Sequence, residues 1–235
     1  MMDKNWNILS ADTLAVNSLA KELNVDKIIA HLLVLRGVKD FQQAKQFFRP
    51  ELEDLHDPFL MKDMIKAVNR ISKAIENNEK ILIYGDYDVD GTTAVAMTYL
   101  FFKKYNKNIE YYIPCRYNEG YGVSIKGVNY AKANNFSLII ALDCGIRAIN
   151  QIEYANNNNI DFIICDHHMP EKKMPKAIAI LNPKQSNCIY PYKDLSGCGV
   201  GFKLIQAFSI QNQLPISEIV EYLDLVTISI AADIV

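Results

Sequence analysis

The chain has 235 residues, half of them apolar, and a formal net charge of −2. A chain of this length and composition folds into one or two soluble domains with a sizeable core, and its charge lacks the basic footprint typical of nucleic-acid-binding domains. No apolar run reaches the roughly 18 residues of a membrane span, and no signal peptide opens the sequence. The five cysteines form no C-x-x-C pair, which argues against a disulfide framework and favours a reducing, cytoplasmic location.

Residues 1–78 are predicted to form an N-terminal helical region. Apolar residues recur there at three- and four-residue spacing, and aspartate, glycine and proline mark the helix ends. The expected helices run from Asp12 to about Leu23, Val25 to Arg36, Phe41 to Phe48 and Met61 to Asn77. His31 and His56 have no ligand-spaced partner, so neither is expected to bind a metal.

From residue 79 to 235, short apolar runs alternate with helical patterns. The expected strands are Ile81–Tyr84, Ile109–Ile113, Leu138–Asp143, Phe162–Cys165 and Ala177–Leu181. The expected helices are Thr92–Tyr105, Ser124–Asn134, Ala148–Asn157, Val200–Gln211 and Ile216–Ile234. This alternation is typical of an α/β fold in which helices cover a parallel sheet.

Three aspartates at alternate positions follow the first expected strand, in the segment GDYDVDG at 85–91. Asp86, Asp88 and Asp90 repel one another unless a cation lies among them, and ligands of open α/β sheets bind at the carboxyl edge. A divalent cation is therefore expected. An EF-hand loop is disfavoured because Met97 occupies the position that requires a bidentate glutamate, and a phosphate-binding glycine loop needs a lysine. A solvated acidic turn stays open as an alternative.

Further acids and histidines end two other expected strands. Asp143 ends the third strand, and Asp166, His167 and His168 end the fourth. If the strands are parallel, all of these side chains lie at the same edge of the sheet as the three aspartates. Carboxylate and imidazole ligands without thiolate suit Mn²⁺ or Mg²⁺. Two such ions can clamp a phosphoester between an attacking water and a leaving oxygen.

This ordered set of motifs resembles the DHH phosphoesterase superfamily, which is named for the triplet at 166–168. Within that superfamily it is similar to the N-terminal half of the RecJ exonucleases, which degrade single-stranded DNA from its 5′ end. The motifs are GDYDVDG at 85–91, IPCRYNEGYGVS at 113–124, ALDCGI at 141–146, CDHHMP at 165–170, ILNPK at 180–184, SGCGVGFKL at 196–204 and AADIV at 231–235. The resemblance covers residues 30–235. Tyr84 stands where small-molecule members carry a histidine, which favours the RecJ-like form.

The resemblance implies a role for each matching residue. The implied metal ligands are Asp88, Asp90, Asp143, His167 and Asp233, with Asp143 bridging two Mn²⁺ or Mg²⁺ ions. Asp86 is expected to orient these ligands, and His168 is expected to face the scissile phosphate. The implied catalytic set is therefore Asp86, Asp143 and His168.

Four further residues are candidate substrate contacts. Arg116 can bind a phosphate in a forked geometry, and a surface ion pair with Glu119 is the alternative. Tyr117 and Tyr121 can stack on bases or pack within their own loop. Gly199 lies in a glycine-rich segment before an expected helix, which either forms an anion cradle or only allows close helix packing.

The predicted function is two-metal hydrolysis of single-stranded DNA from the 5′ end, in DNA repair and recombination. The alternatives are a related phosphodiesterase that acts on short oligonucleotides or cyclic dinucleotides, and a non-catalytic binding relative similar to Cdc45. Retention of every expected ligand favours catalysis. RecJ-like proteins continue with a DHHA1 domain and an oligonucleotide-binding domain, which are absent from these 235 residues, so weak DNA binding by this chain alone is expected. Single-strand-binding proteins or helicases are conceivable partners that no motif identifies.

Overall fold

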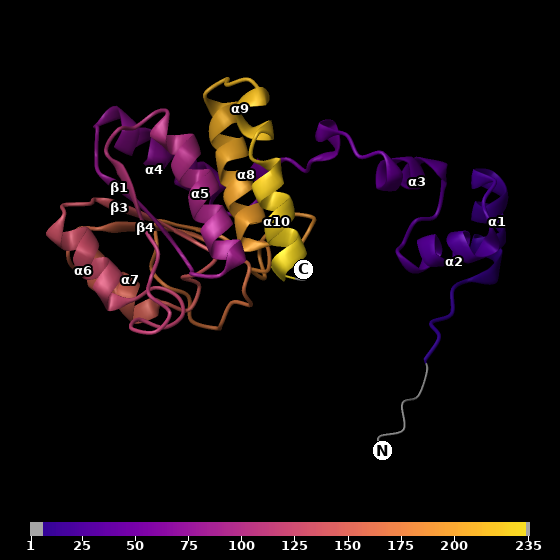
Figure 1. Ribbon diagram of the computed structural model, residues 1–235, viewed down its shortest axis with the longest axis horizontal. Helices are drawn as coiled ribbons and strands as arrows, with labels where there is room; N and C mark the ends of the chain where they lie inside the picture. Colours follow the sequence, from indigo (N-terminus) through magenta and orange to yellow (C-terminus); the bar gives the residue numbers. More distant parts are fainter. Residues whose placement is uncertain (1–6, 234–235) are drawn as a thin grey trace, which may run out of the picture. The chain divides into compact units, whose positions relative to one another are not determined.

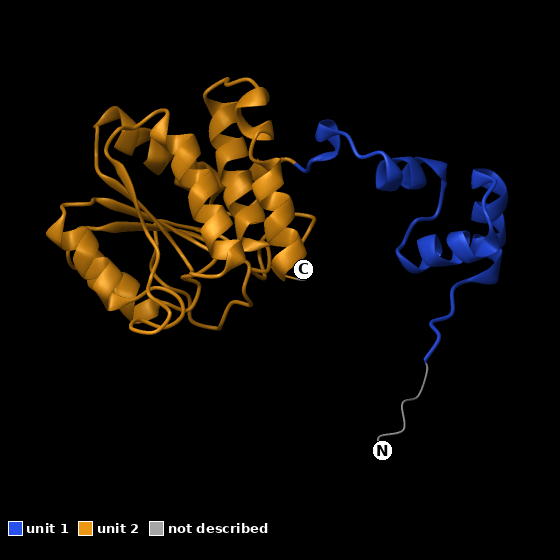
Figure 2. Ribbon diagram, viewed as in Figure 1, with its two compact units in different colours: residues 1–56 blue, residues 57–235 orange. Residues whose placement is uncertain are grey.

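The computed structural model describes residues 7–233 and comprises two compact units, residues 1–56 and 57–235 (Figure 2). The boundary expected at 78/79 falls inside the second unit. The cause is α4 (Met64–Glu76), which packs on α8 (Gly197–Gln211) and on strand β5 (Ala179–Leu181). The helix that leads into the first strand is thus part of the core around the sheet.

The first unit is helical, as predicted. It contains α1 (Thr13–Leu23), α2 (Lys27–Leu35), α3 (Phe41–Phe48) and a short 3₁₀ turn at Leu52–Asp54. Each of the three α-helices begins after an aspartate whose side chain accepts a hydrogen bond from a backbone N–H of the first turn; these caps are Asp12, Asp26 and Asp40. The cap at Asp26 explains why α2 begins at Lys27 and not at Val25.

Five parallel strands form the sheet of the second unit, in the order β2-β1-β3-β4-β5. The first four are β1 (Ile81–Gly85), β2 (Ile109–Tyr112), β3 (Leu138–Leu142) and β4 (Asp161–Cys165). Every residue of β1 and β3 is buried, which is typical of parallel strands covered on both faces. The predicted α/β fold is confirmed. The strand order reverses between β1 and β3, and ligands of such sheets bind in the crevice outside that point.

Helices cover both faces of the sheet (Figure 1). On one face, α6 (Ile125–Ala133) packs against α7 (Ile149–Asn156), and α7 packs on β4. On the other face lie α4, α5 (Val89–Lys103), α8 and α10 (Leu223–Asp233). Because α5 contacts both α8 and α10, the segment that follows β1 lies against the last helices of the described chain.

Two helices begin earlier than predicted, and both changes affect the site. α5 begins at Val89 and not at Thr92, because Asp88 caps it by accepting a hydrogen bond from the Gly91 N–H. α8 begins at Gly197 and not at Val200, because Ser196 caps it through the N–H of Gly199. Asp88 and Asp90 therefore lie at the start of α5, and the glycine-rich segment that begins at Gly197 is the start of α8.

The helix expected over residues 216–234 is divided into α9 (Ser217–Val220) and α10. At the break, Tyr222 is buried against Phe101 and Glu221 pairs with Lys104, which ties the break to α5. Ile234 lies outside the described residues. Within residues 7–233, no helix is both long and apolar enough to cross a membrane.

Candidate metal centre

Three neighbouring strands end level with one another and bring acidic side chains to one edge of the sheet. Gly85 of β1 pairs with Leu142 of β3, and Leu142 pairs with Cys165 of β4. Each of these residues is followed directly by an aspartate: Asp86, Asp143 and Asp166. The carboxyl edge of β1 and β3, where the strand order reverses, is thus lined by carboxylates.

Asp143 directly follows β3, and its side chain is buried, with 1% of the residue exposed. Its backbone φ is +58°, in the left-handed region that aspartate and asparagine tolerate better than other side chains do. Its Oδ1 atom has no hydrogen-bond partner among the described residues. Burial, together with the charges of Asp90 and Asp88, raises the pKa of Asp143 well above its usual range. A cation beside this carboxyl group restores its charged form.

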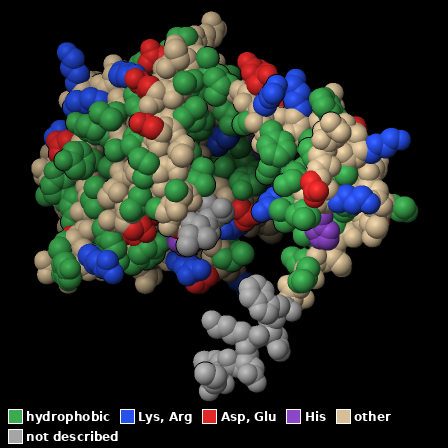
Figure 3. Space-filling view, turned by 45° about the vertical axis from the view of Figure 1, so that its right-hand side comes forward, with side chains coloured by type: hydrophobic (Ala, Val, Ile, Leu, Met, Phe, Trp, Pro, Cys, Tyr) green, Lys and Arg blue, Asp and Glu red, His purple; other side chains and the backbone are tan. Residues whose placement is uncertain are grey.

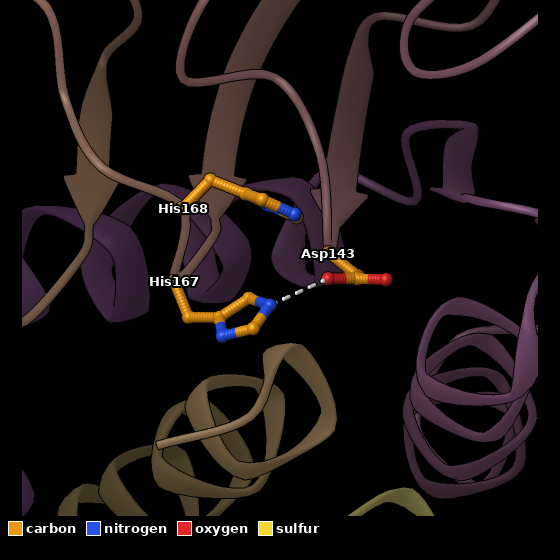
Figure 4. Close-up of side chains that lie close together, drawn as sticks. All are labelled: Asp143, His167 and His168. Atoms are coloured by element: carbon orange, nitrogen blue, oxygen red, sulfur yellow. Dashed lines mark ion pairs between the residues drawn. The ribbon is translucent and has the colours of Figure 1, made fainter. Parts of the chain in front are cut away.

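His167 points toward Asp143 from beyond the end of β4 (Figure 4). Its Nε2 atom lies 3.2 Å from Asp143 Oδ1, 3.7 Å from Asp90 Oδ2 and 3.5 Å from Asp233 Oδ2. The ring is buried, yet neither of its nitrogens has a hydrogen-bond partner within residues 7–233. Because an unpartnered buried polar group is costly, a ring nitrogen that faces three carboxylates fits a metal ligand.

The three aspartates after β1 lie in different surroundings. Asp86 is buried and its Oδ2 has no partner in the described part of the chain, and burial together with the charge of Asp88 raises its pKa. Asp88 is exposed and caps α5. Asp90 is buried in the first turn of α5, where its two oxygens accept bonds from N–H groups of α8. Gly91 permits this turn, because a Cβ atom there would lie 2.5 Å from the carbonyl oxygen of Asp86.

These side chains form three groups in which one ligand atom of each member lies within 4.8 Å of the others. The groups are Asp86, Asp88 and Asp143; Asp90, His167 and Asp233; and Asp143, His167 and His168. Asp143 belongs to two groups, a position from which one carboxylate can bridge two cations. Asp86, expected only to orient the ligands, is itself a member of a group. The buried unpartnered atoms and the oxygen and nitrogen donors fit two divalent cations.

His168 is held from both sides, unlike His167. Its Nδ1 atom lies 2.7 Å from Asp166 Oδ1, and its Nε2 atom lies 2.9 Å from the hydroxyl oxygen of Tyr121. The hydrogen bond with Asp166 raises the pKa of His168. Although burial opposes it, hydrogen bonds from His168 and from the N–H of Ile146 lower the pKa of Asp166. Since a carboxylate only accepts, Nδ1 of His168 donates to Asp166, and Nε2 is the nitrogen on the Tyr121 side.

A cavity of about 210 Å³ opens beside His168. Tyr121, Ile146, Arg147 and Asp166 are among its lining residues. The cavity thus borders the His168 side of the metal centre, where a bound ligand has room.

The three candidate substrate contacts in the loop at 116–121 lie in different surroundings. The Arg116 guanidinium lies over the ring of Tyr87 at 5.4 Å. Glu119, its alternative partner, accepts hydrogen bonds from Tyr112 and from the Cys115 N–H instead. Tyr117 is 93% exposed, so its ring is accessible for stacking. Tyr121, a candidate for base stacking or for packing within its loop, instead places its hydroxyl oxygen 2.9 Å from His168 Nε2.

Gly199 does not present a free N–H to a substrate anion, because its N–H donates to Ser196 Oγ. The preceding N–H groups of α8, those of Gly197 and Cys198, donate to the carboxylate of Asp90 at 2.6 and 2.7 Å. The anion at this helix N-terminus is therefore a side chain of the protein itself. A Cβ atom at Gly197 would lie 2.5 Å from Asp143 Cβ, so Gly197 is the glycine on which this packing depends.

Two residues without an assigned role in the sequence analysis contribute to the centre. Asp166 orients His168, and its position directly after a strand was a usable signal. Ser229 of α10 donates to Asp90 Oδ1 at 2.7 Å. A single serine within an apolar helix carries no sequence pattern, so Ser229 could not be found that way.

Basic and acidic side chains are interspersed on the face shown in Figure 3. This view shows no single large basic patch, in keeping with the net charge of −2. The overall charge therefore supplies no general attraction for a polyanion.

The chain is similar to several known proteins. The single-stranded-DNA-specific exonuclease RecJ of Bacillus subtilis (strain 168) is 41% identical over 230 residues, which are 98% of this chain but 28% of that protein. A crystal structure of exonuclease RecJ bound to manganese matches with 28% identity and a TM-score of 0.68, covering 74% of this chain and 44% of that one.

A crystal structure of RecJ from Thermus thermophilus in complex with Mn²⁺ has a TM-score of 0.78 and covers 97% of this chain and 32% of that one. At 24% identity, this likeness supports the fold alone. The model of the DHH family, N-terminal domain, matches residues 80–230, which contain β1 to β5 and most of the residues of the three metal-binding groups. The chain therefore belongs to the DHH family.

Proposed function

We propose that this chain carries the catalytic centre of a metal-dependent, single-strand-specific 5′→3′ DNA exonuclease of the RecJ type. The observation that carries the proposal is the set of three ligand groups linked through Asp143 and His167, which include buried atoms of Asp86, Asp143 and His167 without a hydrogen-bond partner in residues 7–233. The preference for single-stranded DNA rests on the names of the relatives, which this chain covers only in part. We assign residues 79–235 to the DHH domain and residues 1–78 to an N-terminal helical region whose last helix, α4, packs in the core of the second unit. We place the protein in the cytoplasm.

The proposed cofactor is two Mn²⁺ or Mg²⁺ ions. The proposed ligands are Asp88, Asp90, Asp143, His167 and Asp233, with Asp143 as the bridge and Asp86 beside it. Two ions of this kind supply positive charge to a scissile phosphate and lower the pKa of a bound water. Binding requires ionised carboxylates, so it opposes the raised pKa that burial gives Asp143 and Asp86.

His168 is proposed to contact the scissile phosphate. Asp166 fixes the ring through Nδ1, which leaves Nε2 pointing toward the site. In this structure the Tyr121 hydroxyl lies next to His168 Nε2. A phosphate oxygen that binds to this nitrogen therefore displaces the hydroxyl. Tyr121 and the exposed Tyr117 then contact the bases or sugars of the strand, and Arg116 contacts its phosphates.

A labelled-strand assay tests this function. The chain is incubated with Mn²⁺ and a single-stranded oligonucleotide labelled at either the 5′ or the 3′ end, and products are resolved on a gel. The proposal predicts immediate release of a labelled mononucleotide from the 5′-labelled strand and gradual shortening of the 3′-labelled strand. Asp143→Asn serves as the inactive control. Hydrolysis of a cyclic dinucleotide with no cleavage of the longer strand would identify the small-substrate alternative, and metal binding without hydrolysis of either would identify a binding relative.

A further inference from the structure

Asp90, in α5, accepts hydrogen bonds from two other helices, α8 and α10. Its Oδ2 accepts a bond from the Gly197 N–H at 2.6 Å, and its Oδ1 accepts one from the Cys198 N–H at 2.7 Å. Oδ1 also accepts the hydroxyl of Ser229, in α10, at 2.7 Å. The carboxylate thus joins α5, α8 and α10 at the metal centre, and its orientation is fixed by three donors.

Ser229 lies within a chain of hydroxyl groups. Its Oγ is 2.6 Å from Ser196 Oγ, and Ser196 Oγ accepts the Gly199 N–H. A serine hydroxyl has one proton, and a carboxylate only accepts. The consistent assignment is that Ser196 donates to Ser229 and Ser229 donates to Asp90. The chain therefore delivers a hydrogen bond to Oδ1 from a fully partnered donor.

The burial pattern of α10 is inverted around this contact. Ser229 is completely buried, whereas the neighbouring Ile228 and Ile230 are about half exposed. Placing a hydroxyl inside and two isoleucines outside opposes the hydrophobic effect, and a buried hydroxyl is tolerated only when it is hydrogen-bonded. The contact with Asp90 is the interaction that rationalises this orientation of α10.

Asp233 lies four residues after Ser229, so both occupy the same face of α10, one turn apart. Through this spacing, the contact between Ser229 and Asp90 also sets the position of the Asp233 carboxylate. Oδ2 of Asp233 lies 3.5 Å from His167 Nε2, and Oδ2 of Asp90 lies 3.7 Å from the same atom. Ser229 therefore connects two of the three members of one ligand group.

We propose that Ser229 is a positioning residue of the metal centre, which holds Asp90 and Asp233 around His167 so that this group binds one of the two cations. The inference rests on the proposed function for its cofactor, but it concerns cation binding and not hydrolysis. Asp90 presents Oδ2 to the centre because Oδ1 is held by Ser229 and by the Cys198 N–H.

The test is calorimetric titration of the metal-free chain with Mn²⁺, without DNA, for the wild type and a series of variants. Ser229→Ala removes the hydroxyl, and Ser229→Cys replaces it with a larger thiol that donates only weakly. Both should weaken one of the two Mn²⁺ binding steps by about 10- to 100-fold, the usual effect of removing a partner that orients a ligand. Ser229→Thr, which retains the hydroxyl, should remain within a few-fold of the wild type.

Thr227→Ala is the matched control. Thr227 is exposed on the same helix, and its hydroxyl donates to the carbonyl of Leu223, so its loss should leave both Mn²⁺ steps unchanged. Melting temperatures in EDTA are measured for every variant. Should Ser229→Ala fail to fold, Ser229→Cys decides, because it creates no cavity.

The outcomes separate the inference from the proposed function. If the wild type binds two Mn²⁺ ions and the Ala and Cys variants bind them with unchanged affinity, even at a lower melting temperature, Ser229 is merely structural and the inference is overturned. If the wild type binds no Mn²⁺, the proposed function fails, and the inference fails with it. The positioning role is supported if one Mn²⁺ binding step is weakened in Ser229→Ala and Ser229→Cys. The same step should be unchanged in Ser229→Thr and in Thr227→Ala.

Discussion

Asp143 Oδ1 and His167 Nε2 lie 3.2 Å apart, although the two residues follow different strands. Both atoms are buried, and neither has a hydrogen-bond partner in residues 7–233. Without a cation, this pair leaves a carboxyl group and an imidazole inside the protein with their polar atoms unused, which is unfavourable. A divalent cation between them turns the same arrangement into a favourable one, so the pair is the point at which metal binding is most easily tested.

Asp143→Asn should abolish binding of both Mn²⁺ ions while the fold is retained. Asparagine keeps the shape of the side chain and tolerates the φ of +58°, but it cannot bridge two cations as an anion. Because burial disfavours the charged carboxylate at this position, the metal-free variant should be as stable as the wild type or more stable, by on the order of 1 kcal/mol. Calorimetry with Mn²⁺ and thermal melts in EDTA measure the two effects.

Asp194→Asn is the control for that experiment, since Asp194 is exposed and lies outside the three ligand groups. It should change neither Mn²⁺ affinity nor activity on single-stranded DNA. Two Mn²⁺ ions bound with wild-type affinity by Asp143→Asn would exclude Asp143 as the bridging ligand.

His167→Ala and His168→Ala should have different consequences. The nitrogens of His167 have no protein hydrogen-bond partner in the described chain, so His167→Ala should raise the Mn²⁺ concentration needed for half-maximal activity by about 10- to 100-fold. His168 is held by Asp166 and faces the site through Nε2, so His168→Ala should lower kcat with little change in the Mn²⁺ requirement. His31→Ala, in the helical first unit, is the control. Identical Mn²⁺ curves for the two variants would contradict this division of roles.

The sequence predicted the fold, and it predicted that most of the candidate site residues meet at one edge of the sheet, because both depend on patterns of short range. Buried parallel strands appear as apolar runs, and the residues after them, such as Asp86 and Asp143, must meet at one edge once the strands are parallel. Asp233 was assigned by resemblance, and the structure places it 3.5 Å from His167 Nε2.

The interactions that the sequence did not reveal are those set by packing between distant helices. No local pattern indicates that the N-terminus of α8 binds Asp90 and not a substrate anion, because α5 and α8 are brought together by the core. Likewise, the contact between Tyr121 and His168 joins two loops 47 residues apart. The starts of α5 and α8 are a different case, because their caps, Asp88 and Ser196, are local and each accepts a hydrogen bond from an N–H three residues on.

Glu79 should make a pH-dependent contribution to stability away from the metal centre. It accepts hydrogen bonds from Arg70, which also binds Asp161, and from Ser137. Although burial opposes it, the bonds from Ser137 and Arg70 lower the pKa of Glu79. Glu79→Gln should therefore reduce the free energy of unfolding at pH 7 by about 1.5–3 kcal/mol.

The sign of the pH dependence follows from the lowered pKa. The stability that ionised Glu79 provides is present above its unfolded-state pKa of about 4.3 and is lost as the pH falls through the lower folded-state value. The difference between wild type and Glu79→Gln should shrink toward pH 3. Urea unfolding at pH 7, 5 and 3.5 measures it, with the exposed Glu76→Gln as control. A difference that stays constant down to pH 3.5 would show that ionisation of Glu79 is not its source.

Thiol reagents should modify one cysteine in the folded chain. All five cysteines are free, and Cys115 is exposed while the other four are buried. Burial also raises the pKa of Cys144, Cys165 and Cys198, which keeps them in the unreactive thiol form. Mass spectrometry after brief alkylation should find a single adduct, absent in Cys115→Ser, and unchanged Mn²⁺ binding. Rapid labelling of Cys144 with loss of Mn²⁺ binding would instead indicate an open site that uses a thiolate.

Gly197→Ala and Gly199→Ala should differ, although the two glycines lie in the same first turn of α8. A Cβ atom at Gly197 would lie 2.5 Å from Asp143 Cβ, a contact with a rigid part of the centre. The substitution should lower the free energy of unfolding by about 1–3 kcal/mol and weaken Mn²⁺ binding, because Asp143 must move.

At Gly199 the nearest atom to an added Cβ is Ser196 Oγ at 3.3 Å, a tight but adjustable contact. Alanine also favours the helix by about 1 kcal/mol over glycine, so Gly199→Ala should stay within about 1 kcal/mol of the wild type and bind Mn²⁺ normally. Activity on DNA separates the two readings of Gly199. Loss of DNA cleavage with normal Mn²⁺ affinity would support an anion cradle at Gly199, whereas normal cleavage means that the N-terminus of α8 serves Asp90, the anion that it already binds.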